Sequence, residues 1–186
     1  MTRAVEKMQS ALDAIERHNP RVNAVISLSD PDDLMKQAEA ADQVPTEQHG
    51  LLHGEPIAIK DLANAAGFET SMGSPIFKKN HVKTDDIMVA RMRAAGAIII
   101  GKTNTPEFGL GSHTFNPVHG ATGNAYDATR SAGGSSGGAA VALAMGMLRY
   151  ADGSDMMGSL RNPAGWNNVY GMRPTWGLVP SEPLGD

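Results

Sequence analysis

The chain has 186 residues, the length of one ordinary domain, and its 41% hydrophobic and 19% charged residues are typical of a globular protein. Its net charge of −4 gives no basic surface for nucleic acid or for an anionic membrane, and the absence of cysteine excludes thiolate nucleophiles and cysteine-ligated metals. Apolar stretches fall far short of the roughly 20 residues of a transmembrane helix and no signal-peptide pattern is found, so we expect a cytoplasmic protein.

The N-terminal part of the chain alternates predicted helices and strands. Apolar residues recur every three to four positions over 2–19 and predict an amphipathic helix that ends at Asn19-Pro20. The elements expected next, in chain order, are a strand over 22–28, a helix from the Asp30 cap to about Ala41, a short buried strand over 56–60, a helix over 84–95 and a strand over 97–100.

An alanine-rich segment over 139–148 predicts a further helix. Its small side chains would let the helix pack closely against a sheet, so we expect it at the centre of the fold. The strand–helix–strand order predicts the α/β class, as a layered mixed β-sheet flanked by helices. We expect a single domain, residues 1–186, without a closing element at its C-terminus.

Three segments contain the residues that could carry chemistry. They are Gly54-Glu55-Pro56-Ile57-Ala58-Ile59-Lys60-Asp61, Gly133-Gly134-Ser135-Ser136-Gly137-Gly138 and Gly153-Ser154-Asp155-Met156-Met157-Gly158-Ser159-Leu160-Arg161-Asn162-Pro163-Ala164. Lys60 ends an apolar strand, where burial would lower its pKa and let it act as a base. The last histidine, His119, precedes all of these serines, so the Ser-Asp-His order of α/β-hydrolases cannot be assembled from them.

Each of these residues also has an interpretation without catalysis. Lys60 could be a strand-end lysine whose ammonium reaches solvent, and Ser135 and Ser136 could lie in a flexible turn or an anion-binding nest before a helix. Ser159 could be a turn or N-cap serine. His49 and His53 are four residues apart, as in a helical metal pair, but the flanking glycines disfavour a helix and no third ligand is evident.

Taken together, the three segments resemble the amidase signature family, whose members use a Ser–cis-Ser–Lys triad. Two further segments support the resemblance: residues 95–104 with Glu107-Phe108, and Tyr170-Gly171-Met172-Arg173-Pro174-Thr175. The order of all five matches the N-terminal portion of such enzymes. The enzymes are more than twice as long, so the resemblance implies that residues 1–186 are the N-terminal part of a single amidase signature domain, either as a fragment or as a natural truncation.

The resemblance also assigns roles to individual residues. It implies that Lys60 is the base, that Ser135 follows a cis peptide bond and relays a proton, and that Ser159 is the nucleophile. The backbone N–H groups of Met156, Met157 and Gly158 would form the oxyanion hole, and the supporting residues would be Ser136, Asp155 and Arg161. Met157 stands where most members carry glycine, which is costly if that position needs a positive φ.

The function implied is hydrolysis of a small carboxylic amide through an acyl-enzyme, with no cofactor and no metal. One alternative is the glutamine-hydrolysing A-type subunit of an amidotransferase, which would need a partner protein. The other is a catalytically silent fragment of the fold. The resemblance leaves a homodimer open, and we expect the chain to require the family's C-terminal segment, because its acyl pocket is built largely there.

Overall fold

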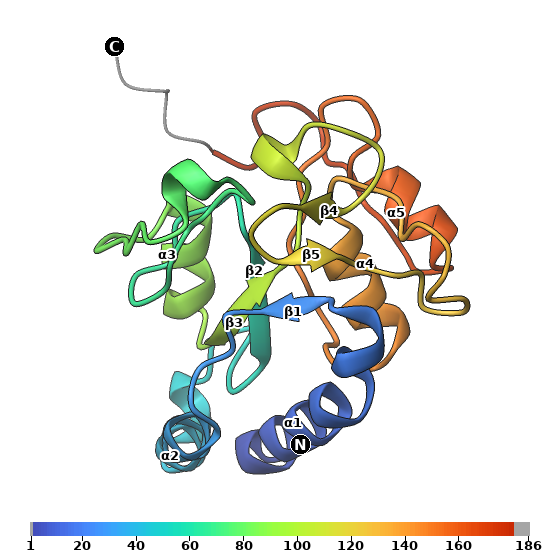
Figure 1. Cartoon of the computed structure of the whole chain (residues 1–186). Coiled ribbons are helices and arrows are strands. Elements are labelled where there is room, and N and C mark those ends of the chain that lie inside the picture. The colour runs from blue at the N-terminus through green and yellow to red at the C-terminus, as the bar shows by residue number, and fades with distance from the viewer. Residues whose placement is uncertain (1, 181–186) are drawn as a thin grey trace.

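A mixed three-stranded sheet forms the centre of the structure, a computed structural model that describes residues 2–180 (Figure 1). The strand order is β1 (Val25–Ile26), β3 (Ile98–Thr103), β2 (Pro56–Lys60). β2 runs parallel to β3, whereas β1 runs antiparallel to it. This confirms the predicted mixed sheet, although β1 is much shorter than the strand expected over 22–28. The C-terminal end of the chain, at which no closing element was expected, lies outside the described residues.

The ladder between β2 and β3 contains a β-bulge. The register shifts between Ile57 and Ala58, which leaves Ile100 as an additional residue in β3. Beyond the shift, Ile59 pairs with Lys102. Because side chains alternate between the two faces of a sheet and paired residues share a face, the register shift places Lys102 on the face that Ile59 occupies.

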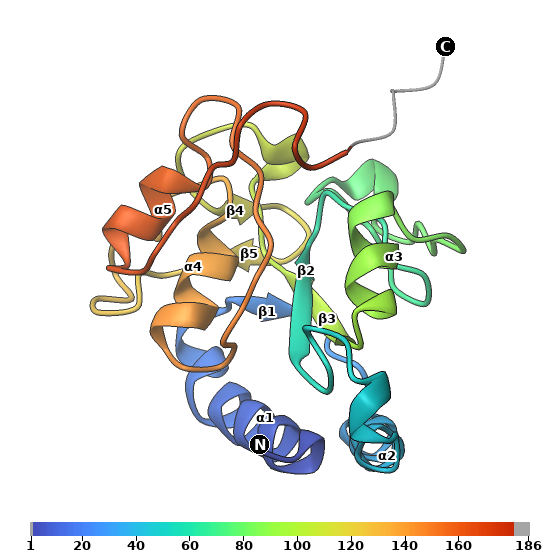
Figure 2. The same cartoon turned by 180° about the vertical axis from the view of Figure 1, so that it is seen from behind.

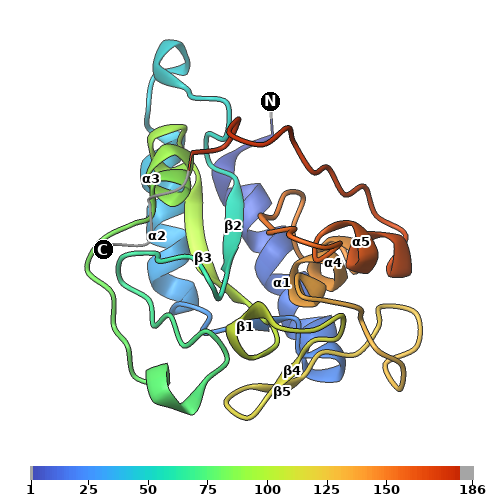
Figure 3. The ribbon, with the colours of Figure 1, turned by 90° about the horizontal axis from the view of Figure 1, so that it is seen from above.

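Helices cover both faces of the sheet. α3 (Ile87–Ala94) packs on one face, and α1 (Ala4–Val22), α2 (Pro31–Asp42) and α4 (Gly137–Ala144) pack on the other (Figures 2 and 3). α4 contacts all three strands and is buried over 137–142, as its alanine content predicts. Its second residue must be glycine, since a β-carbon at Gly138 would collide with the backbone of Asn104.

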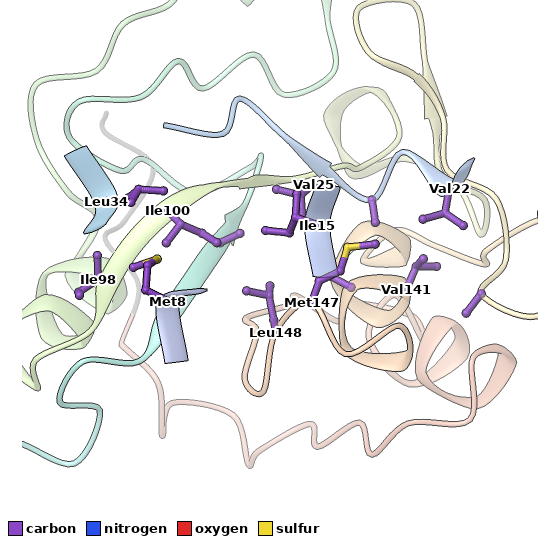
Figure 4. Packing of buried hydrophobic residues seen from close by; sticks show 14 of the residues in the cluster. Met8, Ile15, Val22, Val25, Leu34, Ile98, Ile100, Val141, Met147 and Leu148 are labelled. Atoms are coloured by element: carbon purple, nitrogen blue, oxygen red, sulfur yellow. The ribbon is translucent and has the colours of Figure 1, made fainter. Parts of the chain in front are cut away.

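Two apolar clusters hold these layers together. The larger one joins α1, α2, α4 and the facing side chains of the sheet, including Met8, Ile15, Leu34, Ile100 and Val141 (Figure 4). The smaller one packs α3 against the opposite face through Ile57, Ile59, Val89 and Ile99. The sheet thus divides the protein into two compartments, and a side chain at the end of a strand enters one or the other.

Several boundaries differ from the predicted ones. α1 continues through Pro20 to Val22, because Pro20 lies in the last turn and the Asn19 side chain bonds to the backbone of Ala24 and Val25 just beyond it. The periodicity did not predict α5 (Arg161–Trp166) or the hairpin of β4 (Phe115–Asn116) and β5 (Gly120–Ala121). Within residues 2–180, no helix has the length and apolar character needed to cross a membrane.

Candidate active site

Lys60 is the last residue of β2 and is 1% exposed. Its side chain enters the compartment of α4, because the two residues before it alternate between the α3 face at Ile59 and the α4 face at Ala58. The Nζ atom donates to three hydroxyl groups: Oγ of Ser135 at 2.7 Å, of Ser136 at 2.9 Å and of Ser154 at 2.9 Å. The strand therefore delivers a buried amine to a cluster of serines.

The surroundings of Lys60 favour the neutral amine more than water does. Burial lowers the pKa of Lys60 to about 8, against the opposing charges of Asp152 and Asp155. Three hydroxyl oxygens accept from an ammonium, and after loss of one proton one of these hydroxyl groups can donate to the lone pair of the amine while the other two still accept. The side chain can thus be accommodated in either protonation state.

Ser135 and Ser136 lie in the turn that enters α4, and the peptide bond between Gly134 and Ser135 is cis. Both serines are almost fully buried. The turn packs tightly against its neighbours, since a β-carbon at Gly134 would collide with the carbonyl group of His113. This close packing explains why glycine precedes the serine pair.

The segment that carries Ser159 is fastened to this turn through the backbone. The Ser136 N–H donates to the Ser159 carbonyl oxygen at 2.9 Å. Within the described residues the Ser159 hydroxyl group has no hydrogen-bond partner, so it does not extend the contact between Lys60 and Ser135. The structure therefore joins two of the three predicted catalytic side chains directly and places the third on an adjoining segment.

A two-pronged ion pair braces the same segment. Arg161 donates from Nε to Asp155 Oδ2 at 2.8 Å and from Nη2 to Oδ1 at 3.0 Å. Asp155 also accepts backbone N–H groups of Gly158 and Leu160. These bonds, the Arg161 side chain foremost, hold the pKa of Asp155 well below its usual range. Asp155 thus fixes the backbone on both sides of Ser159.

The backbone N–H groups of the predicted oxyanion-hole residues differ in whether a hydrogen bond within the protein already occupies them. The Gly158 N–H donates to Asp155 Oδ1 at 2.8 Å and is thereby occupied. The side chains of Met156 and Met157 are largely exposed, and in the described part of the chain their N–H groups have no hydrogen-bond partner. Gly158 has φ +110° and Met157 is not in the left-handed region, so methionine at 157 carries no backbone strain of that kind.

Two residues that contact Lys60 were not predicted from the sequence as part of the site. Ser154 contacts Nζ directly, and Oδ1 of Asp152 accepts the backbone N–H of Lys60 at 2.8 Å. Asp152 and Ser136 also line a pocket of about 210 Å³ beside α4. Neither Asp152 nor Ser154 has a local signal, because both reach Lys60 across more than 90 positions of sequence.

A second buried lysine lies in the opposite compartment. Lys102 is fully buried, 3.2 Å from Asp61 Oδ1, and donates to the Ala63 carbonyl group and to Thr70 Oγ1. Ser71 donates to the other oxygen of Asp61 at 2.5 Å. Lys102 therefore has a carboxylate partner at its amine, whereas among residues 2–180 no carboxylate pairs with the amine of Lys60.

His49 and His53 are bonded to the backbone. Their rings stack with centroids 3.6 Å apart, and their Nε2 atoms bond to the carbonyl groups of Val44 and Ala41. Across the part of the chain that the structure describes, no three metal-ligating side chains gather. The serine cluster remains the candidate site.

Comparison with known proteins places the chain in a family. A family model described as Amidase matches residues 6–186. The chain is 42% identical to the A-type subunit of a glutamyl-tRNA(Gln) amidotransferase from Cyanothece sp., over 95% of this chain and 37% of that protein. It is 43% identical to an indoleacetamide hydrolase from Bradyrhizobium diazoefficiens, over 96% of this chain and 34% of the relative.

Solved structures agree with the sequence comparison. A bacterial aryl acylamidase described as an amidase signature enzyme superposes with a TM-score of 0.91 at 31% identity, over 100% of this chain and 39% of its own. The A-type subunit of the Thermotoga maritima glutamyl-tRNA(Gln) amidotransferase gives 0.82 at 37% identity, over 95% and 36%. The chain spans a little over a third of the length of these relatives. The match over 6–186 and these likenesses confirm the resemblance: the chain belongs to the amidase signature family.

Proposed function

We propose that the chain hydrolyses a carboxylic amide through an acyl-enzyme on Ser159, with Lys60 as base and Ser135 as proton relay. The observation that carries this proposal is the 2.7 Å contact between Lys60 Nζ and Ser135 Oγ, made by a lysine whose burial lowers its pKa to about 8. A base that titrates near neutral pH is what activation of a serine hydroxyl requires. Family membership supports the same reaction.

The proposed reaction begins with neutral Lys60. Ser159 Oγ attacks the amide carbon while its proton passes to Ser135 Oγ, whose own proton passes to Lys60 Nζ. The resulting tetrahedral adduct collapses when the proton returns along the same path to the departing nitrogen, which leaves as ammonia or an amine. Water then attacks the acyl ester by the same relay and releases the carboxylic acid, which restores Ser159.

The backbone around Ser159 would stabilise the negative oxygen of that adduct. The N–H groups of Met156 and Met157 are available, and Gly158 would contribute once its bond to Asp155 opens. In this proposal Asp155 and Arg161 hold the segment in shape, and Ser136 ties it to the serine turn through its contact with the Ser159 carbonyl group. No step calls for a metal or an organic cofactor.

Hydrolysis of glutamine as the A-type subunit of an amidotransferase is a second candidate function. The 42% identity to the A-type subunit of a glutamyl-tRNA(Gln) amidotransferase favours this function. The similar identity to an indoleacetamide hydrolase favours a free-standing amidase. In the first case ammonia would be handed to a partner protein. Turnover of glutamine, compared with turnover of simple aliphatic and aryl amides, separates the two.

We further propose that residues 1–186 are the N-terminal part of one amidase signature domain and work together with the family's C-terminal segment. The chain covers 34% to 39% of the relatives named above, and large apolar side chains are exposed in the segment that carries Ser159 and beside the pocket that Ser136 lines. These side chains are Met156, Met157, Tyr170 and Met172. Sedimentation and amide turnover of the 186-residue chain test this: a monodisperse, fully active monomer would refute it.

A serine-directed fluorophosphonate tests the main proposal. The reagent should label the chain, or the chain with its C-terminal segment, at Ser159, and Ser159→Ala should remove the label. Ser10→Ala, which changes an exposed serine of α1, is the matched control and should be labelled like the wild type. Equal labelling of wild type and Ser159→Ala would reject Ser159 as nucleophile, and no labelling of either would favour the silent fragment.

A further inference from the structure

Asp152 makes an unusual contact for a carboxylate beside a candidate base. Its Oδ1 atom accepts the backbone N–H of Lys60 at 2.8 Å, the point at which β2 ends. Ser154, two residues later, bonds to the Nζ atom of the same lysine at 2.9 Å. The segment over 152–154 therefore holds both the main chain and the side chain of Lys60.

The position of this carboxylate differs from that of Asp61. Asp61 lies 3.2 Å from the amine of Lys102 and forms a direct ion pair with it. Asp152 instead bonds to the main chain of Lys60, while hydroxyl groups occupy the Nζ atom. Its negative charge is thus near the amine without taking one of its donors. Such a charge favours the ammonium form, but leaves the Nζ atom in contact with the serines.

The charges around the pair are few. The charges of Asp152 and Asp155, both from the segment that carries Ser159, raise the pKa of Lys60 against the effect of its burial. The charges of Lys60 and Lys102, near the ends of β2 and β3, act to lower the pKa of Asp152. Burial raises the pKa of Asp152, whereas the donated N–H and the two lysines favour its anion. The protonation of Lys60 and that of Asp152 should therefore be coupled.

We propose that Asp152 is a positioning residue for the reaction: it fixes the end of β2 through the Lys60 N–H and, as an anion, favours the protonated amine of Lys60. Its consequence for catalysis rests on the proposed function, but the coupling itself does not. In the proposed reaction Lys60 must take up a proton during attack and return it to the leaving nitrogen. The negative charge of Asp152 strengthens the binding of that proton to Lys60, and a neutral residue at position 152 would leave Lys60 a weaker base.

The first test follows the protonation of Lys60 by NMR and needs no activity. The Cε signal of Lys60, assigned with Lys60→Met, is followed from roughly pH 6 to 11 in protein labelled at lysine. Asp152→Asn keeps an oxygen that can accept the Lys60 N–H and removes the charge. We expect its Lys60 midpoint to fall by about one pH unit relative to wild type. Asp127→Asn, on an exposed loop and absent from the charges that act on Lys60, is the control and should leave the midpoint unchanged.

A second measurement does not require Asp152→Asn to fold. Coupling between two sites is reciprocal, so removal of the Lys60 charge must shift Asp152 as well. In Lys60→Met the Cγ signal of Asp152 should titrate at a higher pH than in wild type. A Lys60 midpoint unchanged in Asp152→Asn, or an Asp152 midpoint unchanged in Lys60→Met, overturns the proposal and leaves Asp152 with a purely structural role. Failure of the proposed function would show instead as absent turnover with the coupling intact.

Discussion

Nζ of Lys60 lies 2.7 Å from Oγ of Ser135, and the two residues come from the end of β2 and from the turn that enters α4. No carboxylate occupies the Lys60 amine in the part of the chain that the structure describes. The contact is therefore a hydrogen bond between an amine and a hydroxyl group, rather than an ion pair. Most of the chemistry expected of this site depends on that distinction.

Ser159→Ala and Ser135→Ala should affect turnover in different ways. The first removes the nucleophile, so no acyl-enzyme should form, whereas the second interrupts the relay and should slow acylation by about a hundredfold or more. Substrate affinity should change little in either variant. Rapid-quench trapping of the acyl-enzyme measures both effects, with Ser10→Ala as control. Equal amounts of trapped acyl-enzyme in wild type and Ser159→Ala would contradict the assignment.

The pH dependence of kcat/KM should report the protonation of Lys60. Because burial lowers the pKa of Lys60 to about 8, the rate should rise with pH through that value and then level off. A lysine exposed to water would place the same rise near pH 10.4. Stopped-flow or steady-state assays across the alkaline range distinguish the two, and a rise centred near pH 10 would exclude Lys60 as the base.

The lowered pKa of Lys60 should make the free energy of unfolding depend on pH. The unfolded chain binds its proton up to the ordinary value of 10.5, and the folded chain only up to about 8, so between these values the unfolded state holds more protons. Wild type should accordingly gain about 3 kcal/mol of unfolding free energy relative to Lys60→Met as the pH rises through that window. Below pH 8 the difference should be constant. Urea titrations at several pH values measure it, and parallel curves throughout would contradict the expectation.

Asp155→Ala should destabilise the segment around Ser159 more than Arg161→Ala does. Asp155 accepts backbone N–H groups as well as the guanidinium, and its removal leaves those donors unpaired, at a cost of about 1–3 kcal/mol. Arg161 is about half exposed, so its ion pair is worth under about 1 kcal/mol. Since Asp155 has a lowered pKa, its stabilisation should persist through neutral pH and be lost in strong acid. Urea unfolding of the two variants is the measurement, and equal losses would be the contrary result.

Lys102→Met should be severely destabilising, because it leaves the Asp61 carboxylate buried without its cation. Loss of one partner from a buried pair costs about 3–5 kcal/mol. The double variant Lys102→Met with Asp61→Asn should recover part of that loss, since neither charge then remains. A double-mutant cycle in urea measures the coupling, and additive losses would show that the two side chains do not interact.

The sequence predicted the parts of the site that have local signals. The apolar run before Lys60 predicted β2 with its observed bounds, and the alanine-rich segment after Ser135 and Ser136 predicted a buried helix. Both features depend on neighbouring residues alone: a continuous apolar run in one case and a row of small side chains in the other.

The rest of the site depends on contacts that no local pattern reports. Asp152 and Ser154 resemble ordinary loop residues, and only the packing of their segment against the end of β2 brings them to Lys60. The three consecutive isoleucines of β3 likewise do not show which one is the extra residue of the bulge. Pro20 suggested a helix end, but the Asn19 side chain allows the last turn to form.

The bulge at Ile100 decides which lysine meets the serines. If the side chains of β3 alternated strictly from Ile98 to Lys102, with no register shift, Lys102 would point toward α4, beside Lys60, where a second ammonium would repel the first. The register shift instead places the two amines on opposite faces of the sheet. The bulge thus keeps the positive charge of Lys102 away from the serines, and the point at which a strand shifts its register, as much as the identity of its residues, determines which lysine lies beside them.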